Sequence, residues 1–360
     1  MPKRLLLLSL SCLLLCACTN DDSSTPQPPS HEECYTGDAY GELKSPYIVF
    51  DSSLEKLHKT TWHCIEFGSY PQAEVVASQY DYLEPYAVKD GDVVIDAKLF
   101  AALENADWNG RETEIDGVRY RRMKAEDAVR FAADSRGHYY WKNPDEYHYF
   151  RYEPVRWRIL NIKGSKALLL ADKALECNRF NSDATDVFWE SSSLREWLNT
   201  DVYGCLFSET EKKSVMLTDV VNAANYYFGT YCGKDTKDYL FLLSESEVFC
   251  SELARNYGFY NSDGIDDPAR RFRPTTYAAC RGAWVSVVDS YKGNTFWFMR
   301  STGYTPDNVT YVCEFGYLYN RGTLVTCSDA GIIPAVCIDL STSKYKAAGT
   351  VCSDDIVQGN

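Results

Sequence analysis

The first 18 residues, MPKRLLLLSLSCLLLCAC, constrain this chain most strongly, because they decide in which compartment the rest of it folds. Lys3 and Arg4 form a short basic segment, and 13 mainly apolar residues follow, from Leu5 to Ala17. A helix that spans a bilayer needs about 20 apolar residues, so this segment is too short to span and has the form of a secretory signal. We therefore expect residues 1–17 to be a signal peptide and the mature protein to lie outside the cytosol.

The end of the signal segment, Leu15-Cys16-Ala17-Cys18, resembles a bacterial lipobox, in which the last cysteine is lipidated and becomes the new N-terminus. We expect Cys18 to carry this lipid, and the membrane to be reached through the acyl chains alone, since two or more chains anchor a protein stably. A cleaved signal that happens to contain cysteines is the alternative, and Cys16 is unusual in a lipobox. The expected location is the bacterial cell envelope, lipid-anchored and extracytoplasmic.

Charge and composition limit the partners of the mature chain. The formal net charge is −14, and removal of Lys3 and Arg4 makes it −16. That charge would repel a nucleic-acid backbone or an acidic lipid surface, so we expect neither as a partner. An apolar content of 45% and an aromatic content of 14%, with 27 tyrosines, predict a folded globule. Its tyrosines line either a β-rich core or a recognition surface.

Eleven of the 14 cysteines follow the signal segment, at wide and irregular spacing. Export makes disulfides chemically possible, and an odd number leaves at least one thiol free when Cys18 is lipidated. Buried free thiols that act as small apolar side chains are the alternative. No CxxC pair follows the signal segment, so a thioredoxin-like or zinc-ribbon site has no support.

The pattern of apolar and polar residues predicts a single α+β domain with short helices and a late antiparallel sheet. We expect a lipid-anchored flexible tether over residues 18–59, because residues 19–45 are rich in Ser, Thr, Pro, Asp and Gly. The domain itself is expected over residues 60–345 and a tail over residues 346–360.

Local signals predict individual elements. Asp116-Gly117 lies between alternating residues and predicts a tight hairpin within 110–123. Residues 124–135 are expected to form a helix with Ala128, Phe131 and Ala132 on one face. Strands are expected in the segments 155–163, 165–172, 294–304, 308–318, 322–329 and 332–340. Capping boxes predict helix starts at Ser193 with Glu196, Ser208 with Glu211, and Ser244 with Glu247.

Eight motifs occur in the order that one bacterial family shows. They are IEFGSYPQ (65–72), YEPVRWRIL (152–160), KALLLADKALECNRFN (166–181), WESSSLREWLN (189–199), GKDTKDYLFLLSESEV (233–248), RPTTYAACRG (273–282), FWFMRSTG (296–303) and IIPAVCIDL (332–340). On these motifs the chain resembles the domain of unknown function 6273 family, which occurs in secreted and lipid-anchored proteins. The late Trp-containing strand and the Pro before the last strand also resemble the C-type-lectin-like fold of formylglycine-generating enzymes and variable surface-binding proteins.

Two motifs depart from the family pattern. FWFMRSTG lacks the second tryptophan and the proline that relatives tend to have, and IIPAVCIDL lacks the arginine that relatives often place before the proline. In relatives that arginine would hold a ligand or a core ion pair, and this chain has no such residue there.

No catalytic residues are predicted. None of the five histidines follows His148, no HExxH or GxSxG motif occurs, and the neighbours His63 and Cys64 would point to opposite faces of a strand. Resemblance to the copper-dependent formylglycine-generating enzymes implies a late pair of cysteine thiolates. Cys313, Cys327 and Cys337 lie in that third of the chain, but no pair matches the enzymes' motif.

Two ligand sites are predicted. Asp263, Asp266 and Asp267 surround a glycine turn and are candidate calcium ligands, with a solvated turn as the alternative and no other cofactor expected. The second site is a cluster of aromatic, amide and guanidinium side chains: Trp297, Arg300, Tyr304, Tyr317, Tyr319, Asn320 and Arg321. We expect ligand contacts from Trp297, Arg300, Tyr304, Asn320 and Arg321. For Trp297 and Arg300 the alternative is a core ring and a buried ion pair.

Together these features predict a surface-anchored module that binds an extracellular glycan or protein. One alternative is an extracytoplasmic enzyme, such as a formylglycine-generating-type oxidase, which would need two thiols within reach of a metal. The other is a structural envelope protein without a concave pocket.

Overall fold

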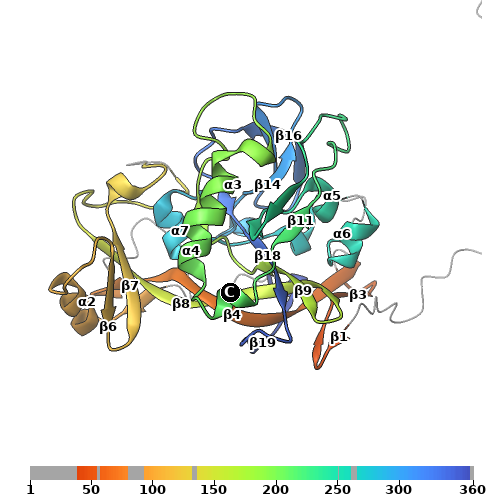
Figure 1. Cartoon of the computed structure of the whole chain (residues 1–360). Coiled ribbons are helices and arrows are strands. Elements are labelled where there is room, and N and C mark those ends of the chain that lie inside the picture. Colours follow the sequence, from red (N-terminus) through yellow and green to blue (C-terminus); the bar gives the residue numbers. More distant parts are fainter. Residues whose placement is uncertain are drawn as a thin grey trace, which may run out of the picture.

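The computed structural model describes residues 39–54, 57–79, 93–131, 136–249, 251–260 and 266–356. The signal segment and Cys18 therefore lie outside the described residues, as does Asp263. The described chain folds into two main sheets with short helices packed against them (Figure 1). The expected α+β class is confirmed.

The larger sheet has ten strands and is built around two long antiparallel strands that cross the base of the molecule in Figure 1. Its central path runs β13 (Leu240–Phe241), β18 (Ala335–Asp339), β9 (Lys166–Ala171), β8 (His148–Lys163), β4 (His58–Val76) and β19 (Lys346–Cys352). The remaining strands are β3 (Tyr47–Phe50), β5 (Val93–Ile95), β6 (Glu112–Ile115) and β7 (Val118–Met123). Val155, Trp157 and Ile159 of β8 are buried on one face, as their alternation predicts.

The ends of the folded region differ from the expected boundaries at residues 60 and 345. β3 pairs with the start of β4, so the part of the expected tether from Tyr47 onward belongs to the sheet. At the other end β19 pairs with β4 on the opposite edge, so the expected tail contributes a strand as well. β3 pairs with its neighbour along the chain, Phe50 opposite His58, whereas β19 pairs with a strand that is distant in sequence, which periodicity alone does not show.

The smaller sheet has five strands in the order β10 (Glu176–Cys177), β17 (Gly331–Ile332), β14 (Trp297–Thr302), β15 (Asn308–Val312) and β16 (Leu318–Leu324). Its last three strands form the late antiparallel sheet that the sequence predicts. The larger sheet differs from that expectation, because β4 and β8 precede most of the helices. Two-stranded ribbons are formed by β1 (Ala39–Tyr40) with β2 (Leu43–Lys44), and by β11 (Thr218–Val220) with β12 (Thr236–Asp238).

The described helices are short: α2 (Ala97–Glu104), α3 (Ser193–Trp197), α4 (Tyr203–Leu206), α5 (Glu245–Val248), α6 (Glu252–Asn256) and α7 (Thr276–Arg281). A π turn over Leu198–Val202 joins α3 to α4, and the resulting long helix stands on the larger sheet in Figure 1. The capping boxes at Ser244 and Ser208 are confirmed. The one at Ser193 is wrong by one position, because Ser192 is the cap and accepts from the Arg195 N–H.

The helix expected over residues 124–135 is wrong for the described part of that segment. Only the 3₁₀ turn Ala125–Asp127 forms, and residues 132–135 lie outside the described residues. The N–H of Val129 donates instead to the carbonyl of Arg281, at 2.7 Å. A tertiary backbone hydrogen bond to α7 therefore replaces the local helical one.

A connected hydrophobic core takes side chains from both sheets, and Trp62, Trp157, Trp189 and Trp297 are fully buried in it. Each of these four indole N–H groups has a hydrogen-bond acceptor. The core therefore connects the two sheets, with the five-stranded sheet and its loops above the ten-stranded sheet in Figure 1.

Candidate functional site

Trp297 is a core residue. Its side chain is 0% exposed, its indole N–H donates to the Arg270 carbonyl at 3.1 Å, and its ring packs edge-on against Phe272. The ring therefore has no surface to offer a ligand. Of the two alternatives drawn from the sequence, core packing is the one that the structure shows.

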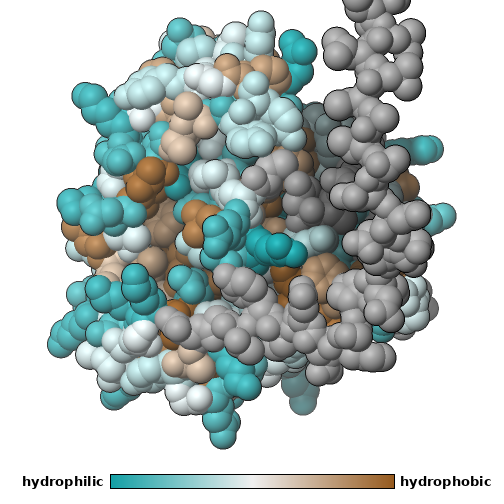
Figure 2. Space-filling view, turned by 90° about the vertical axis from the view of Figure 1, so that its right-hand side faces the viewer, coloured by the Kyte–Doolittle hydropathy of each residue, from teal (hydrophilic) through white to brown (hydrophobic). Residues whose placement is uncertain are grey.

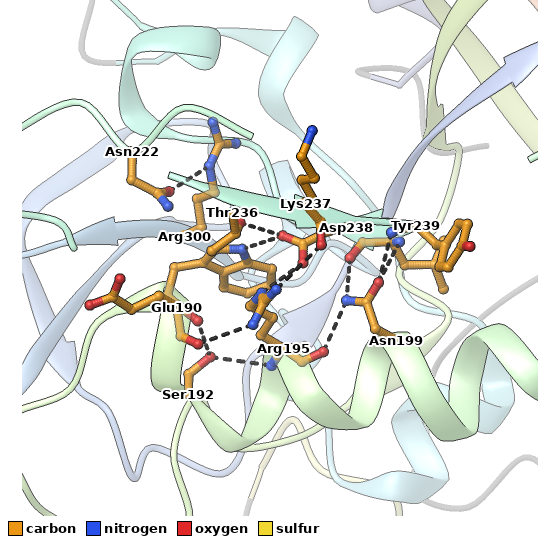
Figure 3. A network of polar contacts seen from close by, with 12 residues as sticks. Glu190, Ser192, Arg195, Asn199, Asn222, Thr236, Lys237, Asp238, Tyr239 and Arg300 are labelled. Carbon is orange, nitrogen blue, oxygen red and sulfur yellow. Dashed lines mark hydrogen bonds and ion pairs between the residues drawn. The ribbon is translucent and has the colours of Figure 1, made fainter. Parts of the chain in front are cut away.

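Arg300 is also buried, with 2% of its surface exposed. Its guanidinium donates to the Glu247 carboxylate, to the carbonyls of Leu242 and Val221 at 2.7 and 2.8 Å, and to Asn222 Oδ1 at 3.1 Å. Figure 3 shows the last of these contacts. Because each nitrogen of the guanidinium group already donates a hydrogen bond within the protein, Arg300 takes part in a structural ion pair and is not a ligand contact.

The polar network of Figure 3 ties the α3 helix to the β11–β12 ribbon. The buried Asp238 carboxylate accepts from Arg195 Nε at 2.6 Å, from the Trp189 indole at 2.9 Å and from the Thr236 hydroxyl at 2.6 Å. Asn199 accepts from the Tyr239 N–H at 2.8 Å. Buried charges of this kind are costly unless fully paired, and here they are paired. The network therefore makes a rigid base for the loop between β11 and β12.

Tyr304 lies on the loop after β14, Asn320 and Arg321 lie on β16, and the structure brings Tyr304 and Arg321 into contact. Tyr304 is 53% exposed, and the Arg321 guanidinium carbon lies 4.8 Å from the centroid of its ring. The Tyr304 N–H donates to the Arg321 carbonyl at 2.9 Å, which fixes the two backbones side by side. Arg321 forms no ion pair within the described residues, so its guanidinium is free to meet a ligand.

A bulge in β16 turns Arg321 toward Tyr304. Tyr319 pairs with Tyr311 and Thr323 with Val309, so three residues of β16 face a single residue of β15. Gly322 takes a φ of +81° there, and a Cβ at that position would lie 2.5 Å from the Val309 carbonyl oxygen. Bulges re-aim side chains in this way, and the glycine makes the geometry accessible.

The loop between β11 and β12 adds exposed rings beside Tyr304. Its sequence ANYYFGTY (224–231) places Tyr226, Tyr227, Phe228 and Tyr231 at the surface. The Phe228 ring lies 5.0 Å from the Tyr304 ring in an edge-on contact. We call the set Tyr226, Tyr227, Phe228, Tyr231, Tyr304 and Arg321 the aromatic surface.

Asn225 holds the loop of the aromatic surface in place. Its buried amide donates to the carbonyls of Thr302 and Asn320, at 2.9 and 3.1 Å, and its Oδ1 accepts from the N–H groups of Tyr227 and Phe228. In Figure 1 this green loop lies at the top of the molecule, close to β16. One amide therefore connects the loop to both strands that carry the predicted residues.

Sequence reasoning missed the four aromatic residues of this loop. The signal was present, because four rings within six positions next to Gly229 are unusual for an exposed turn. Figure 2 shows the face on the right of Figure 1. There hydrophobic residues are mixed with hydrophilic ones in small areas, as Figure 2 shows.

The structure gives the described members of the calcium candidate other partners. Asp266 pairs with Arg271, and the buried Asp267 caps the Ala269 N–H at 2.9 Å and lies 3.5 Å from Arg270 Nη1. Within the described ranges no group of three or more metal-ligating side chains occurs. Asp263 lies outside them, so calcium binding stays a prediction.

A second aromatic site is a cavity of about 370 Å³ on the outer side of β15 and β16. We call it the aromatic pocket. Its lining residues are Trp284, Phe296, Tyr311, Cys313, Glu314, Phe315, Tyr319, Thr323, Cys327 and Asp329. A concave, partly apolar cavity with a few polar groups is the usual form of a small-molecule site.

Two thiols line the aromatic pocket, whereas the third cysteine named from the sequence lies elsewhere. Cys337 is in β18 of the larger sheet. Burial raises the pKa of Cys313 to about 12, and burial together with Asp329 raises that of Cys327 to about 12. Both are therefore neutral thiols, which are poor nucleophiles and poor metal ligands. No disulfide joins two of the nine cysteines in the described part of the chain, and Cys34 and Cys250 lie outside it.

A polar cavity of about 280 Å³ lies between the larger sheet and the α3–α4 helix. Arg121 donates to Glu112 Oε1 at 2.6 Å, to the Tyr152 hydroxyl at 2.7 Å and to Cys205 Sγ at 3.1 Å. Arg119 Nη2 lies 3.6 Å from the same sulfur. This half-buried thiol therefore has two guanidinium neighbours, in contrast to Cys327.

Residues 164–340 match the family described as a domain of unknown function, DUF6273. This part of the chain is a DUF6273 domain. The resemblance carried by the ordered motifs is therefore confirmed, over a narrower range than the expected 60–345. The DUF6273 domain includes the aromatic surface and the aromatic pocket. No curated protein and no solved structure matches the chain. No helix among the described residues is long and apolar enough to cross a bilayer.

Proposed function

We propose that the protein is a lipid-anchored lipoprotein of the bacterial cell envelope that binds an extracellular ligand, a glycan or a protein, through its aromatic surface. The observation that supports this proposal is the contact between Tyr304 and the exposed Arg321, which forms no ion pair within the described residues. The Tyr304 ring in turn contacts the Phe228 ring. A cluster of exposed apolar rings is uncommon on a protein surface and marks an interaction site, and this surface has five exposed rings.

A glycan is the ligand class we favour. Flat tyrosine and phenylalanine rings stack on the apolar faces of sugars, while the tyrosine hydroxyls and the Arg321 fork supply polar contacts to hydroxyl groups. Tyr and Arg are also the residues that dominate protein–protein hot spots, so a protein partner is the second candidate.

A glycan array and a pulldown of surface proteins test this proposal with the same set of variants. We expect Tyr304→Ala and Arg321→Ala each to reduce binding at least about tenfold, as expected for hot-spot residues. Tyr140→Ala, which removes an exposed tyrosine outside the aromatic surface, is the matched control. Unchanged binding in both site variants would place the ligand elsewhere, and a protein captured without any glycan signal would favour the second class.

The lipid anchor is a separate part of the proposal, because Cys18 lies outside the described residues. It is supported by the lipobox-like sequence and by the Ser/Pro-rich segment that follows. Metabolic labelling with palmitate is expected to mark the wild-type chain and to fail in Cys18→Ala. Equal partitioning of both proteins into detergent would contradict the anchor.

We also infer a C-type-lectin-like arrangement of the smaller sheet. Support comes from the buried Trp297 in β14 and from Pro334, which directly precedes β18. An experimental structure of the domain, compared with lectin-like folds, tests this inference.

The alternative function is an extracytoplasmic enzyme, in particular a formylglycine-generating-type oxidase. One observation favours it, namely that Cys313 and Cys327 line the same pocket. The raised pKa of both thiols speaks against it. Incubation with copper and a cysteine-containing peptide, followed by mass spectrometry, decides the point: an unchanged peptide would remove this alternative.

A further inference from the structure

The wall of the aromatic pocket is a continuous row of rings. Phe296 lies 5.7 Å from Tyr311 at 70°, and Tyr311 lies 4.8 Å from Tyr319 at 5°, so these two rings are stacked. Trp284 extends the row beyond Phe296 at 6.3 Å. The antiparallel register, which places Tyr311 opposite Tyr319, makes the stack. Tyr319 stays 38% exposed at the mouth of the pocket.

The charged residues that line this pocket are both acidic, Glu314 and Asp329. Asp329 is already paired with Arg130 at 2.8 Å and accepts a hydrogen bond from the Cys327 thiol at 2.9 Å. The Glu314 carboxylate forms no ion pair with any residue in the described ranges. The pocket therefore combines aromatic rings with one half-buried carboxylate that lacks a counter-charge.

From this combination we propose that the aromatic pocket binds an organic ammonium group. The face of an aromatic ring carries negative charge and attracts a cation, most strongly where water is partly excluded. Glu314 supplies the opposite charge, and a cavity of about 370 Å³ has room for a trimethylammonium-sized group with its substituent. A neutral ligand of the same shape would bury Glu314 without a counter-charge, which is unfavourable.

This site is distinct from the one in the proposed function. The aromatic surface uses Tyr304, Arg321 and the β11–β12 loop, whereas the pocket uses Tyr311, Tyr319 and Glu314. Arg321 would repel a cation, so the two sites are suited to different ligand groups. An experiment that disproves one proposal therefore does not affect the other.

The test is isothermal titration of the full chain in a non-ionic detergent with choline, and with 3,3-dimethylbutan-1-ol as its uncharged isostere. We expect choline to bind saturably and the neutral alcohol to bind at least about tenfold more weakly. Only the cation is attracted by the faces of the aromatic rings and by the Glu314 carboxylate. Equal binding of the two probes, or no saturable binding of choline, would overturn the proposal.

Two variants locate the site. Glu314→Gln keeps the shape but removes the charge, and Tyr319→Leu removes the exposed ring; each is expected to weaken choline binding about tenfold. Tyr304→Ala and Arg321→Ala are controls on the aromatic surface and are expected to leave choline binding unchanged. Thermal unfolding checks that every variant is folded. Wild-type affinity in folded Glu314→Gln would show that the carboxylate plays no part and would contradict the assignment.

Discussion

The Glu245 carboxylate accepts a hydrogen bond from the Tyr226 backbone N–H, at 3.0 Å, and so connects α5 to the loop of the aromatic surface. Glu245 is buried, and its other carboxylate oxygen, Oε1, has no hydrogen-bond partner. Burial raises the pKa of Glu245 from 4.5 to about 7. The support of the loop therefore depends on a group that titrates near neutral pH.

The first prediction follows from this raised pKa. The folded state holds a proton on Glu245 that the unfolded state loses above pH 4.5, so the contribution to stability is complete below pH 4.5 and is lost as the pH rises through about 7. The loss amounts to about 3 kcal/mol. Glu245→Gln keeps an acceptor for Tyr226 without a charge, so its stability relative to wild type should increase by this amount between pH 4 and pH 8.

Urea unfolding followed by tryptophan fluorescence at several pH values measures this difference. Glu252→Gln in α6 is the control, because Glu252 is exposed and its substitution should leave the pH dependence unchanged. If the difference between Glu245→Gln and wild type stayed constant with pH, Glu245 would not be the titrating group.

A second prediction concerns Asn225. Asn225→Ala removes the two hydrogen bonds that join the β11–β12 loop to the carbonyls of Thr302 and Asn320. It also removes the two hydrogen bonds that Asn225 accepts within the loop, and so leaves buried polar groups unpaired. We expect a loss of about 3 kcal/mol in the free energy of unfolding, since each unpaired buried group costs about 1–3 kcal/mol. Amide exchange of residues 221–235 should also accelerate. Asn105→Ala, at the exposed end of α2, is the control, and slow exchange in Asn225→Ala would show that the loop is held by other contacts.

The parts of the fold that the sequence predicts are those specified by neighbouring residues. Asp116 and Gly117 adopt φ values of 51° and 77°, and few residue pairs other than Asp-Gly favour such a turn. The three late antiparallel strands of the smaller sheet follow from strand-rich segments separated by glycine turns. The expected helix over 124–135 failed because Val129 has a distant partner in Arg281. The same reason hides the pairing of β19 with β4.

Only part of the candidate site could be predicted from the sequence. Trp297 and Arg300 belong to the motif FWFMRSTG, which Tyr304 directly follows, and composition alone does not show that the first two point into the core. The bulge that turns Arg321 toward Tyr304 depends on pairing with β15, and the contact of Phe228 with Tyr304 joins residues far apart in sequence. Both contacts depend on pairing between segments far apart in the chain, which cannot be derived from a single sequence.

A third prediction concerns Arg300 and Arg321, both candidate ligand contacts from the sequence, of which only Arg300 had a buried ion pair as its alternative. Arg300→Met leaves the largely buried Glu247 carboxylate without its counter-charge and should lower the free energy of unfolding by about 3–5 kcal/mol. Arg321→Met removes an exposed side chain without an ion pair and should change it by less than about 0.5 kcal/mol. Urea unfolding of both variants provides the comparison. Similar losses in the two proteins would contradict the burial that distinguishes them.

The last prediction concerns two half-buried thiols with opposite surroundings. Cys205 lies 3.1 Å from Arg121 and 3.6 Å from Arg119, whereas Cys327 donates to the Asp329 carboxylate at 2.9 Å. Positive neighbours attract an anionic reagent and a carboxylate repels it, so iodoacetate should modify Cys205 about tenfold faster than Cys327.

Peptide mass spectrometry over a time course measures both rates in one sample, and neutral iodoacetamide provides the reference for access to each sulfur. The preference of Cys205 for iodoacetate over iodoacetamide should fall in Arg119→Gln, because Arg119 is the more exposed of the two guanidinium neighbours. Equal preference at Cys205 and Cys327 would mean that access alone governs their reactivity. The arginines that line the polar cavity would then have no effect on the rate at which a charged reagent modifies Cys205.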